Sequence, residues 1–91
     1  MNNFYLRFNH TIWQNDELTL TKRLIVNFVW NFQIKSGAAY ASDEYIAEVF
    51  NLSVDVVKTL VAELISEGHI KLLEKTPRRL MIVNSSLYPT E

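Results

Sequence analysis

The sequence contains no cysteine, and only two glycines and two prolines occur among its 91 residues. The absence of cysteine excludes disulfide bonds, thiolate nucleophiles and cysteine-based zinc sites. Two glycines cannot build a glycine-rich phosphate-binding loop, and none of the motifs GxxxxGK[ST], GxGxxG, HExxH or GxSxG is present. The two histidines, His10 and His69, fall in unrelated segments. We therefore expect no catalytic residues, no metal ion and no cofactor.

Long apolar runs and an excess of charge are also missing. No apolar run approaches the roughly 20 residues needed to span a bilayer, and the first residues lack the basic-then-apolar pattern of a signal peptide. We expect a cytoplasmic protein with no membrane partner. The formal net charge is only −1, whereas domains that bind nucleic acid are usually basic. Hydrophobic residues make up 48% of the chain, which predicts one compact domain over residues 1–91.

Residues 40–68 predict two helices joined by a tight turn. Ser42 and Ser53 are the expected N-caps, Asn51 and Leu52 form the break, and Gly68 ends the second helix. A buried stripe of Val56, Leu60 and Leu64 is predicted for the second helix. At 100° per residue, this leaves six side chains pointing to solvent: Asp55, Lys58, Thr59, Ala62, Glu63 and Ser66. A short helix, a turn and a longer helix are the ingredients of a helix-turn-helix.

The flanking segments predict an α+β fold that is mainly helical. Residues 4–8 alternate as in a half-buried strand, and residues 9–17 predict a loop or a short helical turn. A long helix is predicted over residues 18–37, with Thr19 or Thr21 as cap, Gly37 as stop and a core face of Leu20, Leu24, Phe28 and Phe32. Residues 38–41 form a link that adds one or two residues to a sheet. Strands at 69–73 and 80–83 make a hairpin around a turn at 74–79, the core spans about 4–83, and 84–91 form a tail or a short cap.

This order of elements resembles the winged-helix family, a helix-turn-helix variant with a β-hairpin wing. The matching residues are Ile46-Ala47, Leu52-Ser53, Val57, Leu64 and Gly68-His69-Ile70 within YASDEYIAEVFNLSVDVVKTLVAELISEGHIKLLEK. Upstream, FYLRFNHTIW followed by LTLTKRLIVNFVWNF is similar to winged-helix domains of phage and plasmid replication proteins and to the N-terminal domain of DnaD-like primosome proteins. The resemblance implies a single winged helix-turn-helix domain with a C-terminal wing and an extra N-terminal strand.

It also implies which residues contact DNA. In the family the second helix of the motif commonly enters the major groove, and the wing contacts phosphates or the minor groove. Here Lys58 would meet a phosphate or a guanine, and Ser53 or Thr59 would donate to a phosphate. The wing residues are Lys75, Arg78 and Arg79, with Lys71 behind them, and Lys22 and Arg23 form either a second small patch or ordinary solvated surface. The helix itself is acidic, since residues 53–68 carry Asp55, Glu63 and Glu67 against Lys58 alone.

A second apolar stripe, formed by Val26, Trp30 and Ile34, lies nearly opposite the core face of the first long helix. Two explanations are open. Either the N-terminal strand and Trp13 fold over the stripe, or it is a dimer or partner interface with Trp30 as its anchor, because tryptophan is enriched at interface hot spots.

Two functions follow from these patterns. The first is a non-enzymatic DNA-binding winged helix, acting as a small transcriptional regulator or a phage or plasmid replication accessory factor. Its partner would be duplex DNA, with single-stranded DNA as the variant, and a homodimer would place two wings on one site. The alternative is a protein-interaction winged helix that uses its acidic helix face, or the Val26, Trp30 and Ile34 stripe, to dock a partner.

Overall fold

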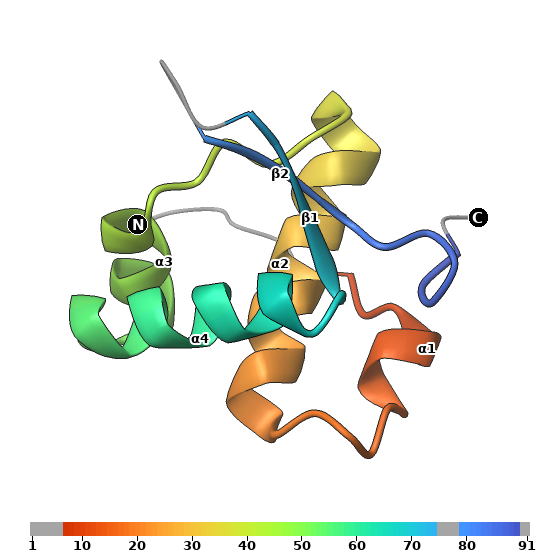
Figure 1. Cartoon of the computed structure of the whole chain (residues 1–91), viewed down its shortest axis with the longest axis horizontal. Helices are drawn as coiled ribbons and strands as arrows, with labels where there is room; N and C mark the ends of the chain where they lie inside the picture. The colour runs from red at the N-terminus through yellow and green to blue at the C-terminus, as the bar shows by residue number, and fades with distance from the viewer. Residues whose placement is uncertain (1–6, 75–78, 90–91) are drawn as a thin grey trace.

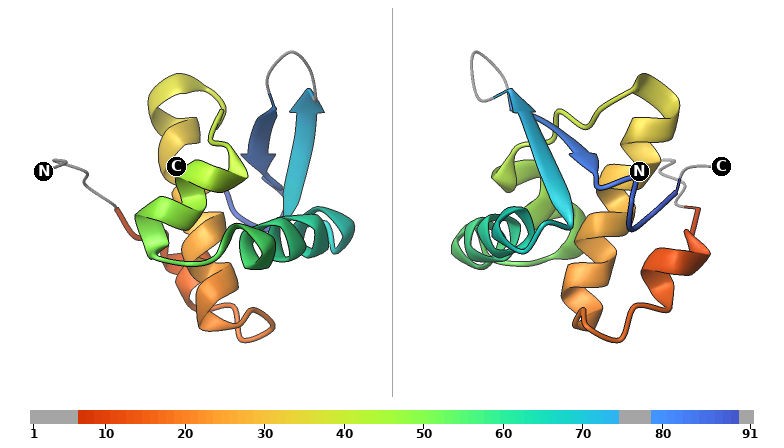
Figure 2. Two further views of the ribbon diagram at one scale, coloured as in Figure 1. Left: turned by 90° about the vertical axis from the view of Figure 1, so that its left-hand side faces the viewer. Right: turned by 45° about the vertical axis from the view of Figure 1, so that its right-hand side comes forward.

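The computed structural model describes residues 7–74 and 79–89, which adopt an α+β fold that is mainly helical, as predicted. Four helices and one two-stranded antiparallel hairpin lie within these ranges: α1 (His10–Trp13), α2 (Leu20–Ser36), α3 (Asp43–Phe50), α4 (Val54–Ser66), β1 (Ile70–Glu74) and β2 (Leu80–Val83). Helix α2 runs through the middle of the molecule, with α3 and α4 on one side of it and α1 on the other (Figure 1). The hairpin stands over α4 and beside α2 (Figure 2).

Helices α2, α3 and α4 begin after N-caps that the sequence predicts, although α2 starts at Leu20 rather than at Leu18. Thr19, Ser42 and Ser53 are the N-caps, and each side chain accepts a hydrogen bond from the backbone N–H three residues further on. Each cap satisfies one of the amides that the first helical turn leaves without a partner. Gly37 ends α2 with a φ of 89°, and Asn51 adopts the left-handed conformation (φ 57°) between α3 and α4, a conformation that asparagine tolerates better than most residues.

The buried side of α4 differs from the prediction. Val57, Val61 and Leu64 are the buried residues, while Val56 is 45% exposed. The apolar residues of this helix fit a helical stripe beginning at either Val56 or Val57, and packing against α3, α2 and β1 selects the second. The core face predicted for α2 is also wrong at its first position. Leu20 is 61% exposed, whereas Leu18, just before the helix, is buried.

The predicted N-terminal strand at 4–8 lies partly outside the described residues, and its last two members, Arg7 and Phe8, are not in a strand. Two asparagines of α2 hold this segment instead. Asn27 and Asn31 both donate to the carbonyl of Arg7 (2.8 Å each), Asn31 accepts from the Arg7 N–H (2.9 Å), and Asn27 accepts from the Asn9 N–H (2.9 Å). Asn27 and Asn31, which interrupt the apolar surface of α2, therefore bind the backbone of residues 7 and 9.

The hairpin is tied to the rest of the chain along one edge. Strands β1 and β2 pair from Ile70–Val83 to Leu72–Met81, and a register shift follows between Leu72 and Glu74. Ala39 then pairs with Met81 through two backbone hydrogen bonds (2.8 and 2.9 Å), which confirms that the link at 38–41 extends the sheet. The Val83 N–H donates to Gln33 of α2 (2.8 Å). The base of the hairpin is thereby fixed to the central helix.

Of the two alternatives for the C-terminal stretch, a tail or a short cap, the described residues 84–89 favour the cap, because Tyr88 anchors them to the core. Tyr88 is 1% exposed, and its hydroxyl accepts from Asn15 Nδ2 (2.8 Å) while lying 2.7 Å from His69 Nδ1. Asn84 donates to the Gly68 carbonyl (2.8 Å). The aromatic ring of Tyr88 supplies the burial, and its hydroxyl satisfies two buried or partly buried polar groups.

Candidate nucleic-acid interface

Helix α4 presents an exposed face beside the hairpin. The six side chains predicted to point to solvent are all exposed: Asp55, Lys58, Thr59, Ala62, Glu63 and Ser66. Ser53 lies just before the helix, and its hydroxyl oxygen accepts from the Val56 N–H (3.2 Å), which leaves the hydroxyl proton available to an acceptor outside the chain. Ser53, Lys58 and Thr59 therefore share the N-terminal half of the exposed face.

The acidic C-terminal half of α4 is held by a lysine of α2. Lys22 Nζ lies 3.0 Å from Glu63 and 3.2 Å from Glu67. Glu63 is in the last turn of α4 and Glu67 is its C-cap, so the two carboxylates are neighbours one turn apart. The hydrogen bond to Glu63, joined by that to Glu67 and by the charges of both, raises the pKa of Lys22 despite the opposing effect of burial. Sequence reasoning missed this pairing because Lys22 is more than 40 residues away, and only the shared face of Glu63 and Glu67 hinted that one cation could serve both.

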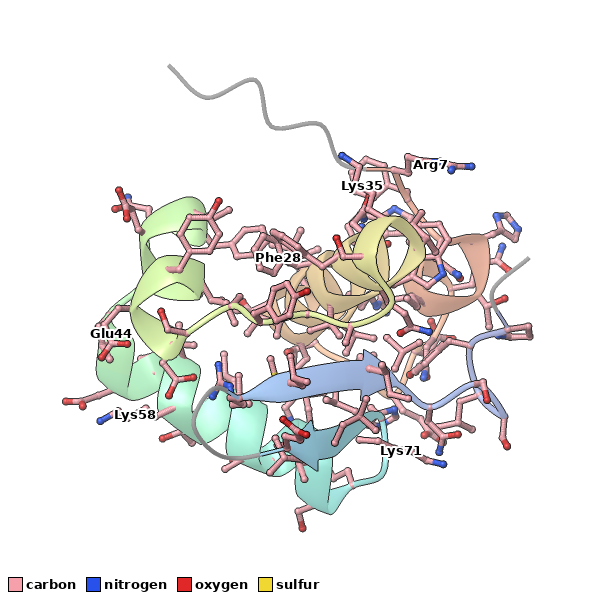
Figure 3. The ribbon with its side chains drawn as sticks, turned by 90° about the horizontal axis from the view of Figure 1, so that it is seen from above. Arg7, Phe28, Lys35, Glu44, Lys58 and Lys71 are labelled. Carbon is pink, nitrogen blue, oxygen red and sulfur yellow. The ribbon has the colours of Figure 1, made fainter. Side chains whose placement is uncertain are left out.

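The predicted wing residues are in different situations. Lys71 is exposed on β1, while Lys75 and Arg78 lie outside the described residues. Lys58 and Lys71 lie on the side of the molecule that α4 and the hairpin form, and Arg7 and Lys35 lie on the opposite side (Figure 3). Two of the predicted DNA-contacting cations, one from α4 and one from the hairpin, therefore lie on the same side of the molecule, at opposite ends of it.

Arg79 is engaged inside the protein. Its Nη1 donates to Asp43 Oδ1 (2.8 Å), its Nη2 donates to the Ala41 carbonyl (2.7 Å), and its side chain is only 23% exposed. The planar guanidinium suits this geometry because its N–H groups diverge as a fork. Arg79 thus fastens the start of β2 to the first turn of α3.

An apolar groove separates α4 from the hairpin. It has a volume of about 280 Å³, and its walls are Val61, Ala62, Ile65 and Leu72, with Lys58 and Arg79 at its polar margin. Leu73 lies nearby in sequence, at the register shift of β1, and is 52% exposed. The groove brings residues of the second predicted helix together with residues of the predicted wing.

The stripe predicted as a dimer or partner interface is largely covered by the chain itself. Val26 is fully buried and Trp30 is 7% exposed, so of the three residues only Ile34, at 37%, reaches solvent. Arg7 lies over the Trp30 ring at 5.9 Å from its centroid. The contact of Arg7 with Trp30 agrees with the first of the two explanations for that residue, whereas Trp13 makes its ring contact with Phe8 (5.0 Å).

The second small patch predicted at Lys22 and Arg23 is also committed to internal contacts. Lys22 binds Glu63 and Glu67, and Arg23 donates to the Asn15 carbonyl (3.0 Å) and lies 3.7 Å from Asp16. Neither residue presents an uncompensated charge to a ligand.

Within the described ranges, no three His, Asp or Glu side chains are grouped so as to hold a metal ion. No helix among the same residues is long and apolar enough to cross a membrane. Comparisons of the chain with protein-family models, with curated proteins and with solved structures return no match.

Proposed function

We propose that this chain is a winged-helix protein that binds duplex DNA without enzymatic activity, as a small transcriptional regulator or as a replication accessory factor of a phage or plasmid. The order of α3, turn, α4 and hairpin, with Ala39 adding a third short piece of sheet beside β2, supports this proposal. In it, α4 is the reading helix and the hairpin is the wing.

The observation that carries the proposal is the pairing of Lys22 with Glu63 and Glu67. Three carboxylates on the reading helix argue against contact with phosphates. Two of them are held by an internal cation, and they lie at the C-terminal end of α4. In helix-turn-helix proteins the N-terminal residues of the recognition helix contact the base edges. That end of α4 presents Ser53, Lys58 and Thr59. Of the carboxylates within α4, Asp55 is the one that has no cation within 4 Å among the described residues.

Titration of a labelled duplex and a labelled single strand with the protein at low and moderate salt tests the proposal. We expect duplex binding that weakens steeply as salt rises, because bound cations release counterions from the phosphates. Lys58→Gln and Lys71→Gln should each weaken binding. Lys35→Gln is the matched control, since it removes the same charge on the opposite side of the molecule (Figure 3). The absence of binding to either DNA at low salt would refute the proposed function.

A second candidate function is a winged helix that docks a protein. The observation that favours it is the apolar groove between α4 and the hairpin, with Leu73 exposed nearby. A basic partner segment would meet Asp55 while its apolar residues enter the groove. Asp55→Lys and Ala62→Arg should then abolish a saturable complex that forms without DNA. Retention of the complex by both variants would rule out this face as the docking surface.

A further inference from the structure

Methyl groups line the exposed face of α4. Val56 is 45% exposed, and Thr59 and Ala62 are exposed at successive intervals of three residues. Side chains at this spacing are neighbours on a helix surface. The three residues span about 9 Å of helix axis at about 1.5 Å per residue, which is close to the rise of three base pairs.

The contribution of Val56 to the core is small. Val57, the next residue, is fully buried and takes the place in the core that the sequence pattern offered to both. Val56 instead lines a shallow depression with Asp55, Thr59 and Leu60. The exposed face of α4 therefore offers apolar surface at its N-terminal end, where a recognition helix meets base edges.

Thymine is the base whose major-groove edge matches such a surface. It alone among the four DNA bases carries a 5-methyl group there, and apolar side chains recognise it by direct contact. Asp55 adds a complementary restriction, because a carboxylate in the major groove accepts from the amino group of cytosine. Val56, Thr59 and Asp55 are together suited to pyrimidine edges, while Lys58 is free to bind a phosphate.

We propose that Val56, supported by Ala62, reads thymine through its 5-methyl group, so that α4 selects duplex sites that contain thymine at the contacted positions. This inference rests on the proposed function, since it requires α4 to enter the major groove. It makes Val56 a residue that determines specificity, whereas Lys58 and Lys71 supply affinity that does not depend on sequence.

Replacement of thymine by deoxyuridine isolates the methyl group. A preferred duplex is first selected from a random pool and then resynthesised with deoxyuridine at one thymine after another, which keeps base pairing and charge unchanged. Affinity should fall about fourfold at each contacted thymine, the loss that corresponds to one buried methyl group. Val56→Ser, which removes both methyl groups of this exposed side chain, should bind the thymine and deoxyuridine duplexes equally at its position.

Lys58→Gln is the matched control. It should weaken binding to both duplexes by the same factor and leave the thymine-to-deoxyuridine ratio unchanged. Equal binding of every deoxyuridine duplex by the unaltered protein overturns the inference while the proposed function stands. A ratio that survives Val56→Ser overturns the assignment to Val56. Failure to bind any duplex at low salt overturns the proposed function itself.

Discussion

At the scale of single residues, the two cations that border the groove between α4 and the hairpin differ in whether they have an internal partner. The Arg79 guanidinium donates to Asp43 and to the Ala41 carbonyl, whereas Lys58 makes no salt bridge within 4 Å in the part of the chain that the structure describes. A phosphate approaching Arg79 would have to compete with a carboxylate and a carbonyl. Lys58 can bind a phosphate without giving up an internal partner.

Lys58→Gln should therefore change the salt dependence of DNA binding, whereas Arg79→Gln should change the stability of the fold. Lys58→Gln should lower the slope of log affinity against log salt by about 0.9, the contribution of one phosphate contact, and should change the free energy of unfolding by less than about 0.5 kcal/mol. Arg79→Gln should leave the slope unchanged and should destabilise the fold by about 1–3 kcal/mol, because Asp43 and the Ala41 carbonyl lose their donor.

Chemical denaturation and a salt titration of DNA binding on the same two variants make the comparison. An Arg79→Gln protein of normal stability with a reduced salt slope would assign Arg79 to phosphate contact after all.

At the scale of elements, α2 sets the electrostatic character of α4. Its Lys22 lies against Glu63 and Glu67, so the negative charge of α4 depends on a residue of another helix. The formal charge of α4 alone does not describe the field that an approaching polyanion meets. The charges that count are those of α4 and Lys22 together.

Lys22→Met should weaken DNA binding although Lys22 lies away from the N-terminal half of α4. The substitution releases two carboxylates on the reading helix, and both then repel phosphates. Binding should recover when Glu63→Gln and Glu67→Gln are added to Lys22→Met, because the carboxylates are removed with their partner. DNA affinities of the single and triple variants, with circular dichroism to verify folding, test the coupling. An unchanged affinity of Lys22→Met would show that Glu63 and Glu67 lie outside the interface.

The docking of residues 7–9 on α2 is a second property at this scale. Asn27→Leu or Asn31→Leu should destabilise the fold by about 1–3 kcal/mol, since buried or partly buried backbone groups of Arg7 and Asn9 lose their partners. Hydrogen exchange gives the direct readout. The Arg7 amide should lose protection in Asn31→Leu, and the Asn9 amide should lose it in Asn27→Leu. Protection that persists at both amides would contradict the docking.

At the scale of the whole molecule, two distant groups make the fold sensitive to alkaline pH. Burial raises the pKa of the Tyr88 hydroxyl, and the nearby charge of Glu17 adds to this effect against the hydrogen bond from Asn15. Lys22 also has a raised pKa, chiefly through its hydrogen bond to Glu63. Both groups favour the protonated form in the folded state. The stability they contribute is therefore complete below their ordinary pKa values, about 10, and is lost as pH rises through the raised values.

The free energy of unfolding should accordingly fall above about pH 10. Tyr88→Phe should reduce this fall and should cost about 1–3 kcal/mol at neutral pH, because Asn15 and His69 lose the hydroxyl between them. Urea denaturation from neutral pH to pH 11 measures both effects. A Tyr88→Phe protein with the same alkaline dependence as the parent would rule out Tyr88 as its source.

Local chemistry explains which features the sequence could predict. Ser42, Ser53 and Gly37 act on backbone groups within a few residues of themselves, so their positions predicted the helix ends. The side of α4 that is buried was not predictable in the same way, because Val56 and Val57 both continue an apolar stripe and only packing chooses between them. The ion pairs of Arg79 with Asp43, and of Lys22 with Glu63 and Glu67, were not predictable from the sequence, because only the fold brings these residues together.

The asparagine contacts of α2 have an evolutionary consequence. Asn27 and Asn31 bind the backbone of Arg7 and Asn9, and backbone atoms are the same for nearly every residue. These backbone contacts exclude only proline at residue 7, because proline has no N–H to donate, and the Arg7 guanidinium over the Trp30 ring adds a weak side-chain preference of its own. In a library of all single substitutions, tolerance should be broad at Arg7 and narrow at Asn27 and Asn31. Distant relatives would then be recognised by two asparagines on a helix more readily than by the segment those asparagines hold.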